Sequence, residues 1–147
     1  MRTAAKITIL LALGLTMLSC GSSVGGLRSG NINGAWTATL TNPNGSIAYE
    51  FSATFTQGTG GALSVSNLNF TIPGPCRLSG ALGAQGSFTP TIGFFGMSMA
   101  ALDVGGPMLN LQGTLSNNMI SGTWTASATL PPCSGNGSFT AQPSMAG

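Results

Sequence analysis

The chain contains no histidine and very few charged side chains. Only 4% of its 147 residues are Asp, Glu, Lys or Arg, whereas a typical domain has about 25%. A nucleophilic triad normally takes its base from histidine, so that chemistry is excluded. With three cysteines and no histidine, no set of residues has the spacing of a zinc or iron–sulfur site. We therefore expect no metal, no cofactor and no enzymatic activity.

The chain has very few basic residues after its first apolar run, where a nucleic-acid partner would need them. Arg2 and Lys6 precede the first apolar run, and only Arg28 and Arg77 follow it. Affinity for nucleic acid comes largely from the neutralisation of phosphates by Lys and Arg. Two arginines cannot form a basic track, so we expect no nucleic-acid partner.

The two acidic residues are the one route to acid–base catalysis. A glycoside-hydrolase pair of carboxylates would have to consist of Glu50 and Asp103. Strand alternation turns Glu50 outward, and Asp103 lies beside the predicted turn at Gly105-Gly106. Nothing in the sequence brings them together, and we keep an acid-only hydrolase as the weakest of three hypotheses.

The N-terminus has the pattern of a secretory signal peptide. An apolar run from Ile7 to Leu18 follows the two basic residues and is too short for the roughly 20 residues that span a bilayer. We interpret residues 1–19 as the signal peptide. The remaining chain then keeps two basic and two acidic residues and is formally neutral.

The end of this segment, Met17-Leu18-Ser19-Cys20-Gly21, resembles the lipobox of bacterial lipoproteins. The resemblance implies that Cys20 is acylated, becomes the mature N-terminus and holds the protein at a membrane. It also implies sorting to the outer membrane, because Gly21 rather than aspartate follows the cysteine. Residues 20–32 are rich in Gly and Ser and fit a flexible tether. The alternative is an ordinary signal peptide whose cleavage site happens to lie near a cysteine.

The other two cysteines each follow a proline, in Pro75-Cys76 and Pro132-Cys133. A secreted protein is exposed to an oxidising compartment, so a Cys76–Cys133 disulfide is the expected state. Two buried free thiols are the alternative.

Residues 33–142 show the period-two alternation of half-buried antiparallel strands. No helix with caps and an apolar 3.6-residue period occurs there. We predict a single all-β domain, an antiparallel meander of about eight or nine short strands that forms a small barrel or a sandwich, and a C-terminal tail at 143–147. The predicted strands after Ile72 are Leu78 to Leu82, Phe88 to Ile92, Phe95 to Leu102, Leu109 to Leu115, Ile120 to Ala128 and Ser138 to Ala141.

Local signals place the turns and one irregularity. Asn42-Pro43-Asn44-Gly45 is a strong turn, and Ser116-Asn117-Asn118 separates two later strands. Leu63 and Val65 have one parity while Leu68, Phe70 and Ile72 have the other. A bulge near Ser66-Asn67 would keep all five side chains facing inward.

Several aromatic residues are candidates for an apolar site. Gly34-Ala35-Trp36 recurs as Gly122-Thr123-Trp124, which indicates either two aromatic positions lining a cavity or two half-buried strands with glycine beside tryptophan. Methionine suits adaptable surfaces as well as irregular cores, so a second cluster also has two interpretations. The candidate ligand-binding residues are Trp36, Tyr49, Phe95 and Trp124, and the second cluster is Phe94, Phe95, Met97, Met99 and Met108.

Two resemblances concern the whole domain. The Gly34-Ala35-Trp36 opening of a meander resembles calycins, the lipocalin and avidin group, which implies a barrel that holds a small ligand. Across most of the mature chain, the pattern also resembles Gly/Thr-rich bacterial envelope lipoproteins, which implies the architecture and a disulfide but no activity. The residues that carry this second resemblance are Gly34, Trp36, Cys76, Ser121, Gly122, Thr123, Trp124 and Cys133.

The leading hypothesis is a membrane-anchored envelope protein with a non-catalytic all-β domain. The alternative is a lipocalin-like carrier of a small apolar ligand. The expected partners are the membrane itself and either such a ligand or another envelope protein.

Overall fold

A computed structural model describes residues 30–74, 82–101, 108–127 and 134–144. These residues form eight strands and one short 3-10 turn at Thr59–Gly61. The strands are β1 (Gly34–Thr41), β2 (Ile47–Gln57), β3 (Ala62–Ile72), β4 (Leu82–Thr89), β5 (Phe94–Ala101), β6 (Met108–Ser116), β7 (Met119–Ser127) and β8 (Gly135–Pro143).

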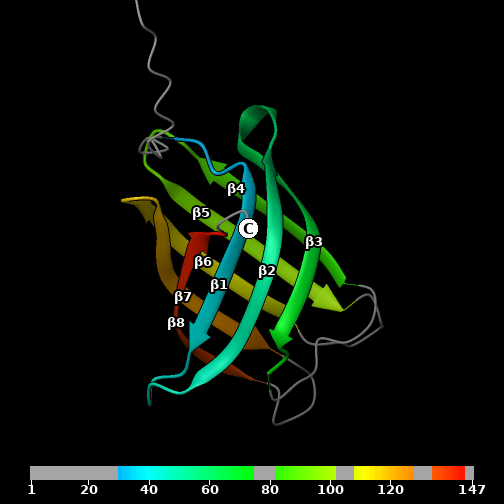
Figure 1. Cartoon of the computed structure of the whole chain (residues 1–147), viewed down its shortest axis with the longest axis vertical. Coiled ribbons are helices and arrows are strands. Elements are labelled where there is room, and N and C mark those ends of the chain that lie inside the picture. Colours follow the sequence, from blue (N-terminus) through cyan, green and yellow to red (C-terminus); the bar gives the residue numbers. More distant parts are fainter. Residues whose placement is uncertain (1–29, 75–81, 102–107, 128–133, 145–147) are drawn as a thin grey trace, which may run out of the picture.

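The strands form a closed antiparallel barrel in which each strand pairs with the next in sequence (Figure 1). The ring closes where β1 pairs with β8, with Leu40 opposite Phe139. The all-β meander predicted from the sequence is confirmed, and closure decides for a barrel over a sandwich. The closure is weakest between β3 and β4, which pair only over Ala62–Ser64 of β3.

Turn chemistry fixes two of the hairpins as predicted. The Gly45 amide donates to the Asn42 carbonyl oxygen at 2.9 Å, which closes the β1–β2 turn. Between β6 and β7, Asn117 and Asn118 have φ of 50° and 61°, the left-handed values that a tight hairpin turn requires and that asparagine tolerates.

The predicted bulge in β3 is also confirmed. Ser52 faces Asn69 and Thr54 faces Ser66, so two residues of β3 lie opposite Ala53 alone. Asn67 takes a φ of 50° at this point. The extra residue resets the alternation, so that Leu63 and Val65 before it and Leu68 and Phe70 after it pack toward the core. The expectation for Ile72 was wrong: its side chain is 37% exposed, because a second register shift in β3 sets it opposite Glu50.

The region around β4 differs from the prediction. Two separate strands were expected, at Leu78–Leu82 and Phe88–Ile92, but a single strand covers Leu82–Thr89. Residues 83–86 lack bulky apolar side chains and so gave no strand pattern, yet their backbone pairs residue by residue with β5. The chain turns at 90–93, and residues 78–81 lie outside the described residues.

The core fills the inside of the barrel and takes side chains from every strand. Inward positions carry large apolar residues such as Trp36, Phe51, Phe88, Leu111 and Phe139, and no polar residue is buried in the described part of the chain. Outward positions of β1, β7 and β8 are mostly Thr and Ser.

The packed region begins before β1. Ile32 belongs by its sequence pattern to the end of the tether, but its side chain is fully buried and belongs to the core. In the ranges that the structure describes, no helix has the length and apolar character needed to cross a membrane.

Candidate functional site

All four candidate ligand-binding residues point into the barrel. Trp36, Tyr49, Phe95 and Trp124 are each no more than 2% exposed. They come from β1, β2, β5 and β7, so strands distant in sequence deliver them to one interior.

Trp36 and Phe95 are joined by a chain of aromatic contacts. The ring centroid of Phe55 lies 6.2 Å from that of Trp36 and 5.6 Å from that of Phe95. Phe139 continues the chain at 6.1 Å from Phe95. These separations are those of aromatic side chains in mutual contact, so the rings fill the space between these residues.

Tyr49 and Trp124 form a second aromatic cluster. Their rings meet edge to face, with centroids 5.5 Å apart and an interplanar angle of 82°. Phe70 packs on Tyr49 at 6.4 Å and on Phe51 at 5.3 Å. The four candidates are therefore divided between two clusters of touching rings.

The two tryptophans of the repeated Gly-x-Trp pattern bind backbone at opposite ends of β1. The Trp36 indole N–H donates to the Ile32 carbonyl oxygen at 2.8 Å, just before the strand. The Trp124 indole N–H donates to the Thr41 carbonyl oxygen at 3.1 Å, at the last residue of the strand. Both polar groups are thus used in holding the barrel together, which agrees with the structural interpretation of the repeat.

Glycines beside Trp124 make this arrangement possible. A Cβ atom on Gly137 would collide with the Thr41 carbonyl and lie 2.6 Å from the indole nitrogen. A side chain at this position would occupy the space of the hydrogen bond. Gly137 therefore allows close approach of β8 to Trp124 and to the end of β1.

Tyr49 is the only described group whose pKa departs clearly from its usual value. Burial raises the pKa of its phenol, because phenolate loses hydration inside the barrel. The side chain is thus a neutral core residue at physiological pH.

The described ranges contain few side chains that could act as an acid, a base or a metal ligand. Glu50 is the one charged residue there; it faces outward, and its carboxylate accepts a hydrogen bond from the Thr71 hydroxyl at 2.8 Å. Asp103, the proposed second carboxylate, lies outside the described residues. Among the described residues, no group of three His, Cys, Asp or Glu side chains could hold a metal ion.

The three cysteines, Cys20, Cys76 and Cys133, also lie outside the described residues. Acylation of Cys20 and the Cys76–Cys133 disulfide therefore stay predictions.

The cluster of Phe and Met residues separates into two groups. Phe95, Met97 and Met99 are buried in the core, whereas Phe94 and Met108 are 38% and 45% exposed on the outside. The strict alternation along β5 places Phe94 outward and Phe95 inward. The core interpretation is therefore confirmed for Phe95, Met97 and Met99, and the surface interpretation stays a hypothesis for Phe94 and Met108.

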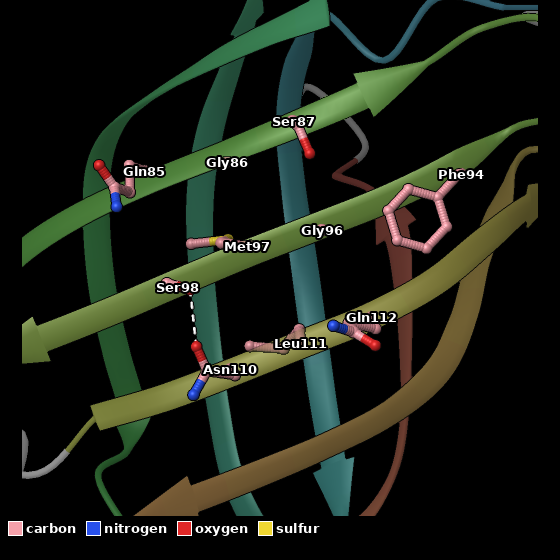
Figure 2. Close-up of a pocket in the computed structure, with 10 residues that line it drawn as sticks. All are labelled: Gln85, Gly86, Ser87, Phe94, Gly96, Met97, Ser98, Asn110, Leu111 and Gln112. Atoms are coloured by element: carbon pink, nitrogen blue, oxygen red, sulfur yellow. Dashed lines mark hydrogen bonds between the residues drawn. The ribbon is translucent and has the colours of Figure 1, made fainter.

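The exposed members belong to a groove that sequence reasoning missed. A shallow groove of about 380 Å³ runs over the outer face of β4, β5 and β6 (Figure 2). A second groove of about 280 Å³ continues it toward Met108 and shares Gln85 and Ser98 with it. The first is lined by Gln85, Gly86, Ser87, Phe94, Gly96, Met97, Ser98, Asn110, Leu111 and Gln112.

Register places the outward residues of the groove in rows across the three strands. Gly96 lies between Ser87 and Gln112, and Ser98 lies between Gln85 and Asn110. A period-two pattern could have identified the outward positions of each strand. The pairing that sets them side by side depends on tertiary structure.

Comparisons with models of protein families, with curated proteins and with solved structures found no match to this chain.

Proposed function

We propose that this chain is a lipid-anchored envelope protein whose β-barrel is non-catalytic and filled by its own side chains. The observation that supports the filled barrel best is the aromatic contact chain from Trp36 through Phe55 and Phe95 to Phe139. An apolar ligand in the interior would have to displace these rings from one another.

The same packing favours a filled interior over the carrier hypothesis. Carriers hold their ligands in concave sites that are largely formed in advance. Here the four candidate residues contact aromatic neighbours, and the indole N–H groups of Trp36 and Trp124 are bound to backbone carbonyls. No described feature favours the carrier as a second function.

The charge distribution supports attachment to a membrane. After removal of residues 1–19 the chain is formally neutral, and the described outer surface is made largely of hydroxyl and amide groups. A protein without net charge tends to associate when it diffuses freely. Tethering through an acylated Cys20 would limit such association.

Metabolic labelling with palmitate tests the anchor. We expect the full chain, expressed in a Gram-negative host, to incorporate label and to fractionate with the outer membrane. Cys20→Ala should abolish both, whereas the matched variant Cys133→Ala should keep the label. Equal labelling of wild type and Cys20→Ala would overturn the proposal.

The filled interior has its own test. We expect no saturable change in tryptophan fluorescence when the protein is titrated with Nile red, a small apolar dye. Saturable quenching that Trp124→Phe weakens would support a carrier and contradict this part of the proposal.

A further inference from the structure

Gly96 is a glycine that the fold does not require. It lies in the middle of β5 and faces outward, and its φ is not in the left-handed region. A Cβ atom there would meet only the Ser87 hydroxyl at 3.4 Å and the edge of the Phe94 ring at 3.6 Å, which are ordinary contacts. Glycine inside a strand lowers stability, and it often marks a place where a ligand approaches the backbone closely.

The inward glycines provide the contrast. A Cβ atom on Gly86 would come within 2.8 Å of the Gly96 carbonyl oxygen, and one on Gly113 would collide with the Ser121 carbonyl. Packing explains these two residues. Packing does not explain Gly96, where the outward positions of the other strands carry threonine or serine without difficulty.

Gly96 forms the floor of the groove, and Phe94 closes one end. The outward residues of β5 after Phe94 are Gly96, Ser98 and Ala100, all small. Six residue steps separate Phe94 from Ala100, which is about 20 Å of extended chain. The groove is therefore long enough for several linked units of a ligand.

The walls carry neutral hydrogen-bonding groups. Gln85 on β4, and Asn110 and Gln112 on β6, each offer an amide that can both donate and accept. The Ser98 hydroxyl donates to the Asn110 side-chain oxygen at 2.6 Å, which turns the Asn110 amide nitrogen away from the floor (Figure 2). None of the residues that line the groove is charged.

This lining selects among ligand classes. A nucleic acid or an acidic chain would need positive charge, and the lining has none. A peptide that binds by strand addition needs an open sheet edge, and β5 beneath the groove is paired on both sides, with β4 and with β6. An acyl chain would bury the amides of Gln85 and Gln112 and the Asn110 amide nitrogen without partners, at a considerable free-energy cost.

A neutral sugar chain fits all of these features. Its hydroxyl groups pair with amide donors and acceptors. The polarised C–H bonds on the face of a pyranose ring are attracted to the negative face of an aromatic ring such as Phe94, which is 38% exposed. We propose that the outer groove of β4, β5 and β6 binds a neutral oligosaccharide, with Phe94 as the stacking ring and Gly96 as the floor. This proposal does not depend on the lipid anchor.

Chemical-shift mapping of the full chain in detergent tests the site. The probes are cellohexaose, maltohexaose and chitohexaose, added separately to isotope-labelled protein. We expect at least one of them to give saturable shifts at the amides of Gly96, Ser98 and Gln112. Phe94→Ala should weaken that binding by about tenfold, the value of one aromatic contact. Ile92→Ala, which removes a more exposed apolar side chain outside the groove, is the matched control and should bind normally.

Gly96→Thr separates binding from folding. It places in the floor the residue type that the chain uses at outward positions of β1 and β7. We expect it to unfold at a temperature equal to or higher than the wild type and to lose oligosaccharide binding. No saturable shift with any of the three sugars would overturn the proposal, as would unchanged binding in Gly96→Thr. Saturable shifts at the same amides with laurate, an acyl-chain probe, and not with the sugars would also overturn it.

Discussion

At the scale of single residues, the burial of Tyr49 makes the stability of the barrel depend on pH. Tyr49 is the only tyrosine of the chain, and its ring packs against Trp124, Phe70 and Gly74. Burial raises its pKa above the usual value of about 10, whereas the unfolded chain releases the proton near that value. The folded state therefore binds the proton more tightly.

The sign of the effect follows from this difference. The contribution of Tyr49 to the free energy of unfolding is complete below about pH 10 and decreases as the pH rises through the raised pKa. Denaturant unfolding across this alkaline range should show the decrease in wild type and a smaller one in Tyr49→Phe. Because there is one tyrosine, phenolate absorbance of the folded protein follows this group alone. A midpoint at or below the ordinary value would contradict the prediction.

At the scale of elements, the bulge in β3 depends on the residue that takes the left-handed conformation. Asn67 has a φ of 50°, and its amide donates to the Thr54 hydroxyl at 3.2 Å across the strands. Glycine tolerates such a φ and β-branched residues do not. Asn67→Gly should therefore leave the free energy of unfolding nearly unchanged.

Asn67→Val should lower the free energy of unfolding by about 1–2 kcal/mol, the cost of a left-handed conformation for a residue with a Cβ atom. Asn69→Val, two positions along the same strand at an exposed site without positive φ, is the matched control and should cost less. Equal destabilisation by the two valines in urea denaturation would show that the bulge is not the cause.

At the scale of the whole molecule, the strand order places the strand ends that flank the two predicted disulfide cysteines at the same end of the barrel. In an up-and-down barrel the end of β3, the start of β4, the end of β7 and the start of β8 all lie at one end. These are the described strand ends that flank the segments with Cys76 and Cys133. The pairing predicted from the sequence is therefore compatible with the arrangement of the strands.

Loop-closure entropy gives the expected size of the effect. Cys76→Ser with Cys133→Ser should lower the free energy of unfolding by roughly 4 kcal/mol relative to the oxidised wild type. Reduction of the wild type should give a similar loss, and the double variant should not respond to reductant. Two free thiols at these positions in non-reducing mass spectrometry would contradict the disulfide.

Much of the local structure was accessible from the sequence because its causes are local. Alternation of apolar and polar residues identified the inward side of most strands, and the parity change between Val65 and Leu68 located the bulge. Asn-Gly and Asn-Asn located two turns. The β4 strand was misplaced because its middle residues carry no apolar pattern and pair through their backbone alone.

By itself, the sequence determined that the domain is all-β, where two of its turns lie, and that it has few charged residues and no histidine. Tertiary structure alone decided that the sheet closes, that Trp36 and Trp124 bind opposite ends of β1, and that Ser87, Gly96 and Gln112 form one row. Alternation is a property of neighbouring residues in one strand, whereas closure and register depend on contacts between strands far apart in the chain. For that reason the filled interior and the outer groove emerged only from the folded barrel.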